Sequence, residues 1–392
     1  MADSDHGQKF LGRRLLIVSF EQFGYHTDTY EYCRYLRDRF KILYLCPDQG
    51  LQRHSLSGVD VVHLDRHPLG KVELGLLSKT HHLLGSDQYH AVFLRRTKFS
   101  FLLRLFHPRV PMIFDVRSGS VEEGRLRRRI ENSLLLFNAT FFRNVSAISA
   151  GLVRQLGLPG RAHVLPLGAN RQPLSTDPLR DGLRLVYVGT FKNRHLERTV
   201  EGLALFVRKH GRGRLVHYDF VGFGSGREVA AIEGVAAEND LADVVRVLGR
   251  VDRDRLPAIL AENNVGVAFT PCVPWFEHQP STKVFEYLQS GLMCIATDNS
   301  ANREVISSGN GVLVEDDADG FCHGLELVAD KLPRWDPRVV AASVRDHTWE
   351  RIVNDNLVPF LEAVQRLSVD RIRLLDDVIG RQRMGCDEST PG

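Results

Sequence analysis

The sequence of 392 residues lacks any apolar run long enough for a membrane-spanning helix, which needs about 18 residues without charge. Its first ten residues, MADSDHGQKF, also lack the apolar centre of a secretory signal peptide. Six cysteines are scattered without the spacing of a metal site, and four of them stand among apolar neighbours, as reduced core cysteines do: Cys33, Cys46, Cys272 and Cys294. We therefore expect a cytoplasmic protein from a reducing compartment.

A strong net charge is missing as well, because the formal charge is only +3. No global field attracts nucleic acid, and we expect no nucleic-acid partner. The charge is nevertheless uneven, because Arg125, Arg127, Arg128 and Arg129 precede the apolar residues 134–137 (LLLF). One interpretation is a solvated helix face beside a core face. The other is a peripheral membrane contact, in which this surface touches anionic lipid or a lipid-linked acceptor.

Short apolar runs alternate with segments of helical spacing along most of the chain, which is long enough for two domains. The predicted strands are residues 14–19, 41–46, 59–64, 91–94, 112–116 and 140–148 in the first half, and 183–188, 217–221, 244–248, 265–269, 293–296 and 311–314 in the second. Buried strands that alternate with helices predict two α/β domains, each a doubly wound parallel sheet. Ligands of such sheets bind at the carboxyl ends of the strands.

A polar, proline-containing stretch at 170–178 is the best candidate for a linker. We predict a flexible N-terminus (1–12), an N-terminal domain (13–172), a C-terminal domain (173–345), a C-terminal helical segment (346–378) and a flexible tail (379–392).

Two strand ends of the second half carry glycine. Residues 188–194 (VGTFKNR) place Lys192 and Arg194 just after Gly189, where fixed cations stabilise the diphosphate that leaves when a glycosidic bond breaks. The alternative is a glycine turn with two solvated cations. Residues 221–226 (VGFGSG) resemble a dinucleotide-binding loop, but the acidic residue expected about 20 positions later lies in an unsuitable helical context. An oxidoreductase is therefore disfavoured, and a tight strand-to-helix turn is the default interpretation.

A third strand end leads into residues 280–291 (PSTKVFEYLQSG), where Ser281 marks the start of a helix whose backbone N–H groups suit a phosphate. Lys283 in the first turn opposes the helix dipole, which suggests that a bound anion offsets the cost. Glu286 lies on the same face as Thr282 and Lys283, and a carboxylate there can accept two ribose hydroxyls. The alternative is a capped amphipathic helix with a Lys–Glu pair. The following strand delivers Thr297 to the same edge.

These segments resemble the retaining nucleotide-sugar glycosyltransferases of family four, which have the GT-B fold. The resemblance covers most of residues 183–306 and, more loosely, the first half. It rests on 188–194, 221–224, 248–251 (LGRV), 280–287, Gly291, Ala296, Thr297 and 303–306 (REVI). It implies two Rossmann-like domains facing a central cleft, the first for the acceptor and the second for the donor. It also implies that the helix within 346–378 crosses back to the first domain.

The resemblance also implies a role for individual residues. Lys192 or Arg194 would contact the diphosphate together with Lys283, Glu286 would bind the ribose hydroxyls, and Thr297 would meet a phosphate oxygen. The further donor-binding residues that it implies are Gly24, Gly189, Thr190, Gly222, Gly224, Arg250, Val251, Ser281 and Thr282.

One departure from the family concerns the donor sugar. The family often has a second glutamate, near the sugar, at the position that His278 occupies here, and Glu277 is one residue away. We therefore take Glu277 and His278 as catalytic candidates, and the sugar and the retention of configuration stay open.

In the first half, residues 115–119 (DVRSG) lie at the end of a predicted strand and resemble the family's Asp-x-Arg segment. Asp115 is a catalytic candidate and Arg117 an acceptor-side candidate, whereas the alternative is an Asp–Arg pair that braces the loop. His26 and Asp28, close to Gly24, are further acceptor-side candidates.

The predicted function is sugar transfer from a nucleotide diphosphate sugar to a hydroxyl of a glycan, a lipid-linked saccharide or a small molecule, with retention expected. No cofactor is expected, and no metal ion. One alternative is a sugar-nucleotide epimerase, for which the sequence shows no clear set of acids and bases. The other is a non-catalytic protein that binds the donor as the partner of another transferase.

Overall fold

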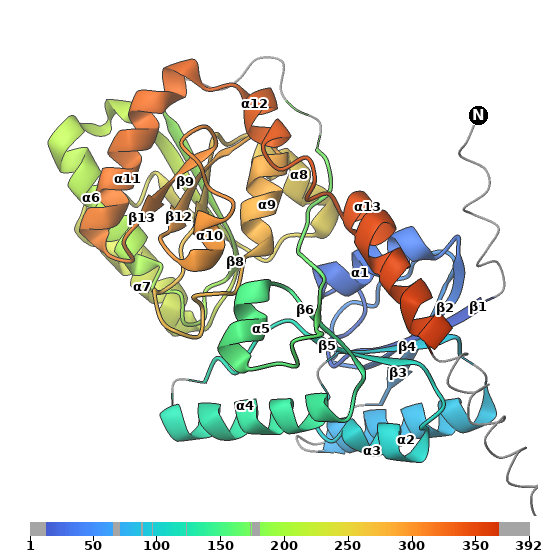
Figure 1. Ribbon diagram of the computed structural model, residues 1–392. Helices are drawn as coiled ribbons and strands as arrows, with labels where there is room; N and C mark the ends of the chain where they lie inside the picture. Colours follow the sequence, from blue (N-terminus) through green and yellow to red (C-terminus); the bar gives the residue numbers. More distant parts are fainter. Residues whose placement is uncertain are drawn as a thin grey trace, which may run out of the picture. The chain divides into compact units, whose positions relative to one another are not determined.

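The computed structural model describes residues 13–65, 71–87, 89–95, 97–122, 124–172, 174 and 181–367. The chain divides into two compact units, of which unit 1 comprises Met1–Leu165 with Glu350–Gly392 and unit 2 comprises Pro166–Trp349. Each unit is a parallel sheet with helices on both faces (Figure 1), so the predicted fold class is confirmed. The predicted flexible ends, residues 368–378 of the predicted C-terminal helix, and positions 173 and 175–178 of the predicted linker lie outside the described residues.

The sheet of unit 1 has the strand order β3-β2-β1-β4-β5-β6-β7, and all its pairings are parallel. Its interior strand β1 is buried on both faces, because Leu15, Leu16, Ile17 and Val18 are each at most 1% exposed. The strands are β1 (Arg13–Val18), β2 (Phe40–Pro47), β3 (Val59–Leu64), β4 (Ala91–Arg95), β5 (Met112–Val116), β6 (Asn144–Ala147) and β7 (His163–Val164).

The helices of unit 1 cover the two faces of this sheet unequally. Figure 1 shows α2, α3 and α4 on one face, whereas α1 and the C-terminal helix lie on the other. Their bounds are α1 (Thr27–Leu36), α2 (Lys71–Ser86), α3 (Phe101–Phe106), α4 (Arg125–Thr140) and α5 (Ala150–Leu156). The C-terminal helix begins with α13 (Trp349–Arg351) and the π-helical turn η5 (Ile352–Leu357) and is described to residue 367.

The sheet of unit 2 has the order β10-β9-β8-β11-β12-β13 and is also wholly parallel. Helices α6, α7 and α11 lie on one face, and α8, α9 and α12 on the other (Figure 1). The strands are β8 (Leu183–Thr190), β9 (Leu215–Phe223), β10 (Val245–Gly249), β11 (Val265–Ala268), β12 (Met293–Thr297) and β13 (Gly311–Val314). The helices are α6 (Glu197–His210), η2 (Arg212–Arg214), α7 (Gly226–Glu238), η3 (Arg253–Arg255), α8 (Leu256–Ala261), α9 (Thr282–Gln289), α10 (Ser300–Arg303), α11 (Ala318–Lys331), η4 (Leu332–Arg334) and α12 (Pro337–Ala342).

Helix α9 is fixed to the sheet by Tyr287, which is completely buried. The described pairing of β8 with β11 ends at Gly266, and beyond it the Tyr287 hydroxyl accepts a hydrogen bond from the backbone N–H of Val188 (2.8 Å) and donates to the carbonyl of Val267 (3.3 Å). Gly266 has no side chain to obstruct the ring, because a Cβ there would lie 2.2 Å from it. The tyrosine thereby sets the position of α9 relative to two strand ends.

Three sequence-based expectations were wrong in detail. The predicted strand 140–148 is only β6, because Thr140 still belongs to α4. Residues 29–40 have apolar side chains at helical spacing and predict a helix over that range, but α1 begins at Thr27 and ends at Leu36, and Phe40 already belongs to β2. Cys272 is exposed rather than part of the core, since the apolar residues around it belong to a loop, whereas Cys33, Cys46 and Cys294 are buried as expected.

Candidate functional site

The predicted donor residues of unit 2 lie where neighbouring strands end. Strands β9, β8, β11 and β12 are adjacent and parallel, so their carboxyl ends share one edge of the sheet. The loop after β8 contacts the 270s loop that follows β11, through Arg194 and Phe276, and the 270s loop contacts the start of α10 through Glu277 and Ser300. The structure thus brings the predicted segments together at one edge.

Arg194 is held in an unusual environment after β8. Its guanidinium lies over the Phe276 ring, 4.6 Å from the centroid, and its Nη1 is buried without a hydrogen-bond partner among the described residues. The backbone on either side is left-handed, with φ of 56° at Asn193 and 52° at His195, although neither residue is glycine. A buried guanidinium nitrogen without an acceptor is costly, and an anionic ligand is the chemical group that satisfies it.

Lys192, the other predicted cation of this loop, has an exposed side chain. Gly189 and Thr190 form the end of β8, and the carbonyl of Thr190 accepts a hydrogen bond from the Tyr187 hydroxyl (2.7 Å). The alternative interpretation of a glycine turn with solvated cations therefore describes Lys192 and does not describe Arg194.

The glycines of the β9 turn serve close packing. A Cβ on Gly222 would lie 1.7 Å from the carbonyl oxygen of Gly189, and one on Gly224 would lie 2.8 Å from Phe191. Ser225 and Glu228 then form a capping box at the start of α7. The tight strand-to-helix turn expected from the sequence is confirmed.

An arginine and an aromatic ring stack beside this turn. The Arg250 guanidinium carbon lies 4.1 Å from the centroid of Phe223, whose side chain is 51% exposed. Arg250 and the half-buried Val251 are among the donor-binding residues that the resemblance implies. Phe223 was missed because the glycines around it drew attention to the backbone. An exposed aromatic ring at the end of a buried strand was the available signal.

The first turn of α9 carries the longest predicted motif. Ser281 is the N-cap, and its Oγ accepts a hydrogen bond from the N–H of Lys283 (3.2 Å), while Thr282 is half-buried. The Lys283 Nζ lies 2.7 Å from Glu286 Oε2, and the two side chains are 24% and 17% exposed. The pair contemplated as the alternative is therefore present, with both groups still reachable from solvent on one face of the helix.

Thr297 does not present its hydroxyl as the resemblance implies. It is completely buried, and its Oγ1 lies 3.1 Å from the hydroxyl of Thr270 and accepts from the Thr270 N–H at 3.3 Å. Its carbonyl accepts a hydrogen bond from Asn302. Thr270, two residues after the end of β11, is half-buried and is thus more exposed than Thr297. Sequence reasoning missed Thr270 because it follows a predicted strand without any motif.

Glu277 turns away from α9 toward the start of α10. Its Oε1 accepts hydrogen bonds from the Ser300 hydroxyl (2.6 Å) and the Ser300 N–H (3.0 Å). These bonds, the hydroxyl first, lower the pKa of Glu277 below its ordinary value, so the group stays ionised. His278, the next residue, is half-buried. The structure therefore gives Glu277 a supporting contact, and the role of His278 stays a prediction.

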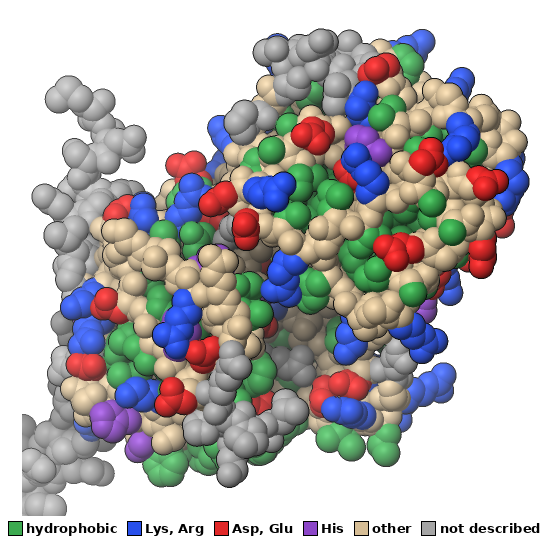
Figure 2. Space-filling view, turned by 180° about the vertical axis from the view of Figure 1, so that it is seen from behind, with side chains coloured by type: hydrophobic (Ala, Val, Ile, Leu, Met, Phe, Trp, Pro, Cys, Tyr) green, Lys and Arg blue, Asp and Glu red, His purple; other side chains and the backbone are tan. Residues whose placement is uncertain are grey.

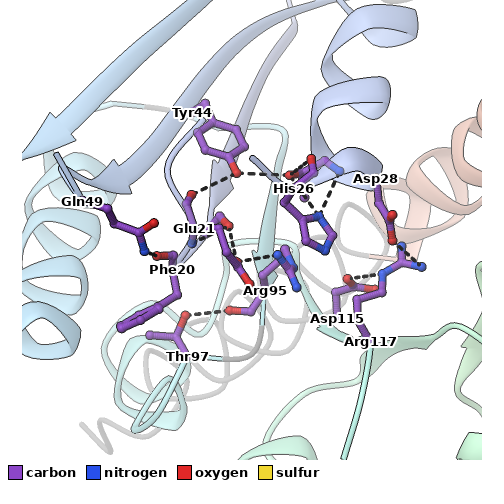
Figure 3. A network of polar contacts seen from close by, with 12 residues as sticks. Phe20, Glu21, His26, Asp28, Tyr44, Gln49, Arg95, Thr97, Asp115 and Arg117 are labelled. Carbon is purple, nitrogen blue, oxygen red and sulfur yellow. Dashed lines mark hydrogen bonds and ion pairs between the residues drawn. The ribbon is translucent and has the colours of Figure 1, made fainter. Parts of the chain in front are cut away.

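A polar network lies at the carboxyl ends of β1, β4 and β5 in unit 1 (Figure 3). Gly24, at the turn after β1, has a left-handed φ of 91°, and a Cβ there would lie 2.6 Å from His54. His26 is the N-cap of α1, and its Nδ1 lies 3.4 Å from the N–H of Thr29. Burial, and then the charges of Arg95 and Arg117, hold the pKa of His26 well below its ordinary value. The imidazole is therefore neutral at pH 7.

Arg117 is the centre of the buried part of this network (Figure 3). It donates to Asp115 Oδ2 (2.8 Å), to the carbonyl of Leu165 (2.9 Å) and to the hydroxyl of Tyr32, and its Nη1 lies 3.5 Å from Asp28. Burial alone lowers the pKa of Arg117, but these anions outweigh burial and raise it. Burial raises the pKa of Asp28, against the opposing charge of Arg117.

Asp115 is fully buried, so the structure has the bracing pair that was the alternative at this position. Its other oxygen, Oδ1, accepts from the Ser146 hydroxyl at 2.6 Å. Both oxygens are occupied, and a substrate would have to break the network to reach them. The bracing alternative is therefore present, and the catalytic role of Asp115 and the acceptor role of Arg117 stay predictions.

Glu21 and Arg95 form a pair that sequence reasoning missed. Arg95 ends β4 and its Nη1 lies 2.5 Å from Glu21 Oε2, just after β1. The Arg95 side chain is 12% exposed and that of Glu21 is 40% exposed. They are 74 positions apart, and each looked like a lone surface charge. Their only signal was that each follows a buried strand.

Among the described residues, no group of three or more His, Cys, Asp or Glu side chains is placed to hold a metal ion. No helix in that part of the chain combines the length and the apolar character that crossing a membrane requires.

Residues 182–330 match the family model described as glycosyl transferases group 1. Among solved structures, the chain is similar to a glycosyltransferase from Rickettsia africae (13% identity, TM-score 0.67, covering 90% of this chain and 98% of the other). It is also similar to the sucrose-phosphate synthase of Thermosynechococcus elongatus (16% identity, TM-score 0.68, covering 93% of this chain and 100% of the other). A third similar structure is the Anabaena protein HepE in complex with UDP (14% identity, TM-score 0.67, covering 90% of this chain and 100% of the other). No curated protein sequence matches the chain.

Two parallel-sheet units and this matched domain define a glycosyltransferase of GT-B architecture. The chain is therefore an enzyme of the glycosyltransferase class, and the matched domain coincides with the unit whose strand ends carry Arg194, Lys283 and Glu286.

Proposed function

We propose that the chain transfers a sugar from a nucleotide diphosphate sugar to a hydroxyl acceptor, with the donor bound at the carboxyl ends of the unit 2 strands. The observation that carries the proposal is Arg194, whose Nη1 is buried without an acceptor among the described residues, at the edge where ligands of such sheets bind. A diphosphate supplies the missing acceptor, and the fixed guanidinium stabilises the negative charge that develops on the diphosphate as the glycosidic bond breaks.

The first turn of α9 supplies the second part of the donor site. Its exposed backbone N–H groups and Lys283 suit a phosphate. When Lys283 moves to the diphosphate, Glu286 is released from its 2.7 Å pair and its carboxylate can accept both ribose hydroxyls. The stacked Phe223 and Arg250 offer a flat surface to the base.

The donor sugar is assigned to the 270s loop. Glu277 supports α10 through Ser300, which leaves His278 as the residue in this loop that we assign to the sugar hydroxyls. We expect His278→Ala to change the preference among donor sugars more than the affinity for a nucleotide diphosphate alone. A uniform loss for all donors would count against this assignment.

We further propose that the anomeric configuration is retained, as in the family that the motifs resemble. Inversion requires a protein base that takes the proton of the acceptor hydroxyl. The predicted carboxylates of unit 1, Asp28 and Asp115, are held by Arg117, and the missed Glu21 is held by Arg95. Only the neutral His26 stands as a base among the predicted acceptor-side residues, so inversion would assign that role to it.

The test is incubation with a panel of donors and with glycan, lipid-linked and small-molecule acceptors. UDP-sugars come first, because similar structures hold UDP and UDP-glucose. We expect one donor to release a nucleoside diphosphate. Proton NMR should show that the transferred sugar has the same anomeric configuration in the product as in the donor. Nucleotide binding without any turnover would instead favour a non-catalytic donor-binding protein, and an epimerised donor without acceptor would favour an epimerase.

A further inference from the structure

A ridge of exposed apolar side chains runs along helices α3 and α4 of unit 1. We call it the apolar ridge and define it by side chains that are 36% to 74% exposed: Phe99, Leu102, Leu105, Phe106, Leu126, Ile130 and Phe137. Figure 2 shows hydrophobic side chains at two places on the lower edge of this unit, one beside His side chains and the other beside basic and acidic side chains. Large apolar side chains that are exposed together on neighbouring helices mark an interaction site.

The ridge is a built feature of two packed helices. The Phe101 ring lies 5.3 Å from that of Phe137 and 5.2 Å from that of Phe141, and Asn138 Oδ1 accepts from the Phe101 N–H at 3.1 Å. The start of α3 is therefore docked on the end of α4. The apolar faces of both helices point outward together, while Leu135 on the opposite side of α4 is buried.

The spacing within α4 places its apolar side chains in one outward stripe. Leu126, Ile130 and Phe137 follow at intervals of four and seven residues, which is one face of a helix, and the first two are 74% and 59% exposed. An ordinary surface helix turns such a stripe inward. Here the stripe faces solvent.

Phe99, just before α3, supports the same conclusion. Its φ is 60°, a left-handed conformation that bulky residues avoid, and its side chain is 41% exposed. Strained backbone that holds an aromatic ring in water is typical of a functional surface.

The charge around the ridge is positive. Helix α4 carries four arginines and one glutamate, and Arg125 and Arg129 immediately precede the apolar Leu126 and Ile130. The Arg127 side chain is 70% exposed and forms ion pairs with Glu122 (3.5 Å) and Glu131 (3.8 Å). Basic residues that border an outward Leu, Ile and Phe stripe are the pattern of helices that lie in the interface of an anionic bilayer.

We propose that the apolar ridge docks unit 1 on a bilayer that contains anionic lipid. The apolar side chains enter the boundary between head groups and acyl chains, and the arginines of α4 bind lipid phosphates. A second copy of the chain is the poorer occupant, because a twofold contact through this face sets the same arginines against each other. The inference goes beyond sugar transfer and needs neither donor nor acceptor.

The test is sedimentation of the full chain with vesicles of phosphatidylcholine alone or with about one third phosphatidylglycerol. We expect binding only to the anionic vesicles, and its loss at 1 M salt, where the Debye length falls to about 3 Å. Arg125→Gln with Arg129→Gln should weaken binding about 10- to 30-fold, because each arginine near the surface contributes about fivefold. Leu126→Ser with Ile130→Ser should weaken it by a similar factor.

Matched controls lie in unit 2, where Val339 is 60% exposed and Arg208 is an exposed arginine of α6. Val339→Ser with Arg208→Gln should leave vesicle binding unchanged. A Phe106→Trp variant gives an independent readout, because its emission should shift to the blue on anionic vesicles only. Failure to bind anionic vesicles, equal binding to neutral ones, or full binding by both ridge variants overturns the proposal. A dimer that Leu126→Ser and Ile130→Ser abolish, without vesicle binding, does so too.

Discussion

The hydroxyl of Tyr287 accepts a hydrogen bond from the backbone nitrogen of Val188 at 2.8 Å, so the helix of the longest sequence motif is bonded to the strand that leads to Arg194. Tyr287→Phe leaves the buried N–H of Val188 without a partner and should destabilise the chain by about 1–3 kcal/mol. The loss is measured by urea unfolding. Affinity for a nucleotide diphosphate should fall as well, because α9 shifts. Unchanged stability together with unchanged affinity would contradict this role.

Lys283 and Glu286 should contribute to different parts of nucleotide recognition. Glu286→Gln removes the charged acceptor for the ribose hydroxyls and should weaken UDP about 10- to 100-fold while abolishing any preference over 2′-deoxy-UDP. Lys283→Ala should weaken both ligands equally. Calorimetric titration measures these affinities. The matched control is Lys209→Ala, since Lys209 pairs with Glu326 at 3.0 Å on the surface of the same unit.

The preference of the Glu286→Gln variant for UDP over 2′-deoxy-UDP decides whether Glu286 binds the ribose. If the Glu286→Gln variant still prefers UDP over the deoxy ligand, Glu286 does not read the ribose, and the 2.7 Å pair with Lys283 is a helix-stabilising contact.

Asp115→Asn separates the bracing role from the catalytic one. Asp115 accepts hydrogen bonds from Arg117 and Ser146. A neutral side chain there removes a negative charge that compensates the buried Arg117 guanidinium. We expect a loss of about 3 kcal/mol or more in unfolding free energy, in the range for breaking a buried ion pair. Activity per folded molecule should stay within about threefold of the wild type, because each 1.36 kcal/mol of barrier is tenfold and no reacting group is lost. A stable but inactive variant would instead support a catalytic role for Asp115.

The low pKa of His26 gives a pH dependence of stability with a defined sign. Because burial holds the pKa of His26 in the folded chain well below its ordinary value of about 6.5, the unfolded chain takes up a proton between pH 7 and 5 that the folded chain does not. Stability therefore falls as pH falls through this window. His26→Asn keeps an N-cap acceptor and removes the titration, so the dependence should decrease by one proton in urea unfolding at several pH values. An identical slope in the variant would show that His26 titrates normally.

Much of the fold follows from the sequence, because short apolar runs flanked by polar turns identify buried parallel strands. The residues 183–188 and 217–221 fall within β8 and β9 for this reason. The two-residue β7 has no such run and was missed. Which strand end belongs to the site also follows, since glycines and cations collect there.

The direction of individual side chains does not follow from the sequence. Thr297 follows a predicted strand and Asp115 lies near the end of another, yet both are buried. Thr297 is hydrogen-bonded to Thr270, and Asp115 accepts a hydrogen bond from Ser146. The pair of Glu21 and Arg95 needs the spatial order β1-β4, which places residues 74 positions apart side by side. Pattern alone gives the edge of the sheet, and packing decides which polar groups on it remain reachable.

The most direct test of the donor site is thermal unfolding of the full chain with and without nucleoside diphosphates. A ligand at about 100 times its dissociation constant adds about 2.7 kcal/mol to the folded state. The account predicts that one nucleoside diphosphate raises the Tm of the wild type and of Lys209→Ala, and leaves that of Arg194→Ala with Lys283→Ala unchanged. If no nucleoside diphosphate raises the Tm, or if the double variant responds as the wild type does, the donor site is not where we place it.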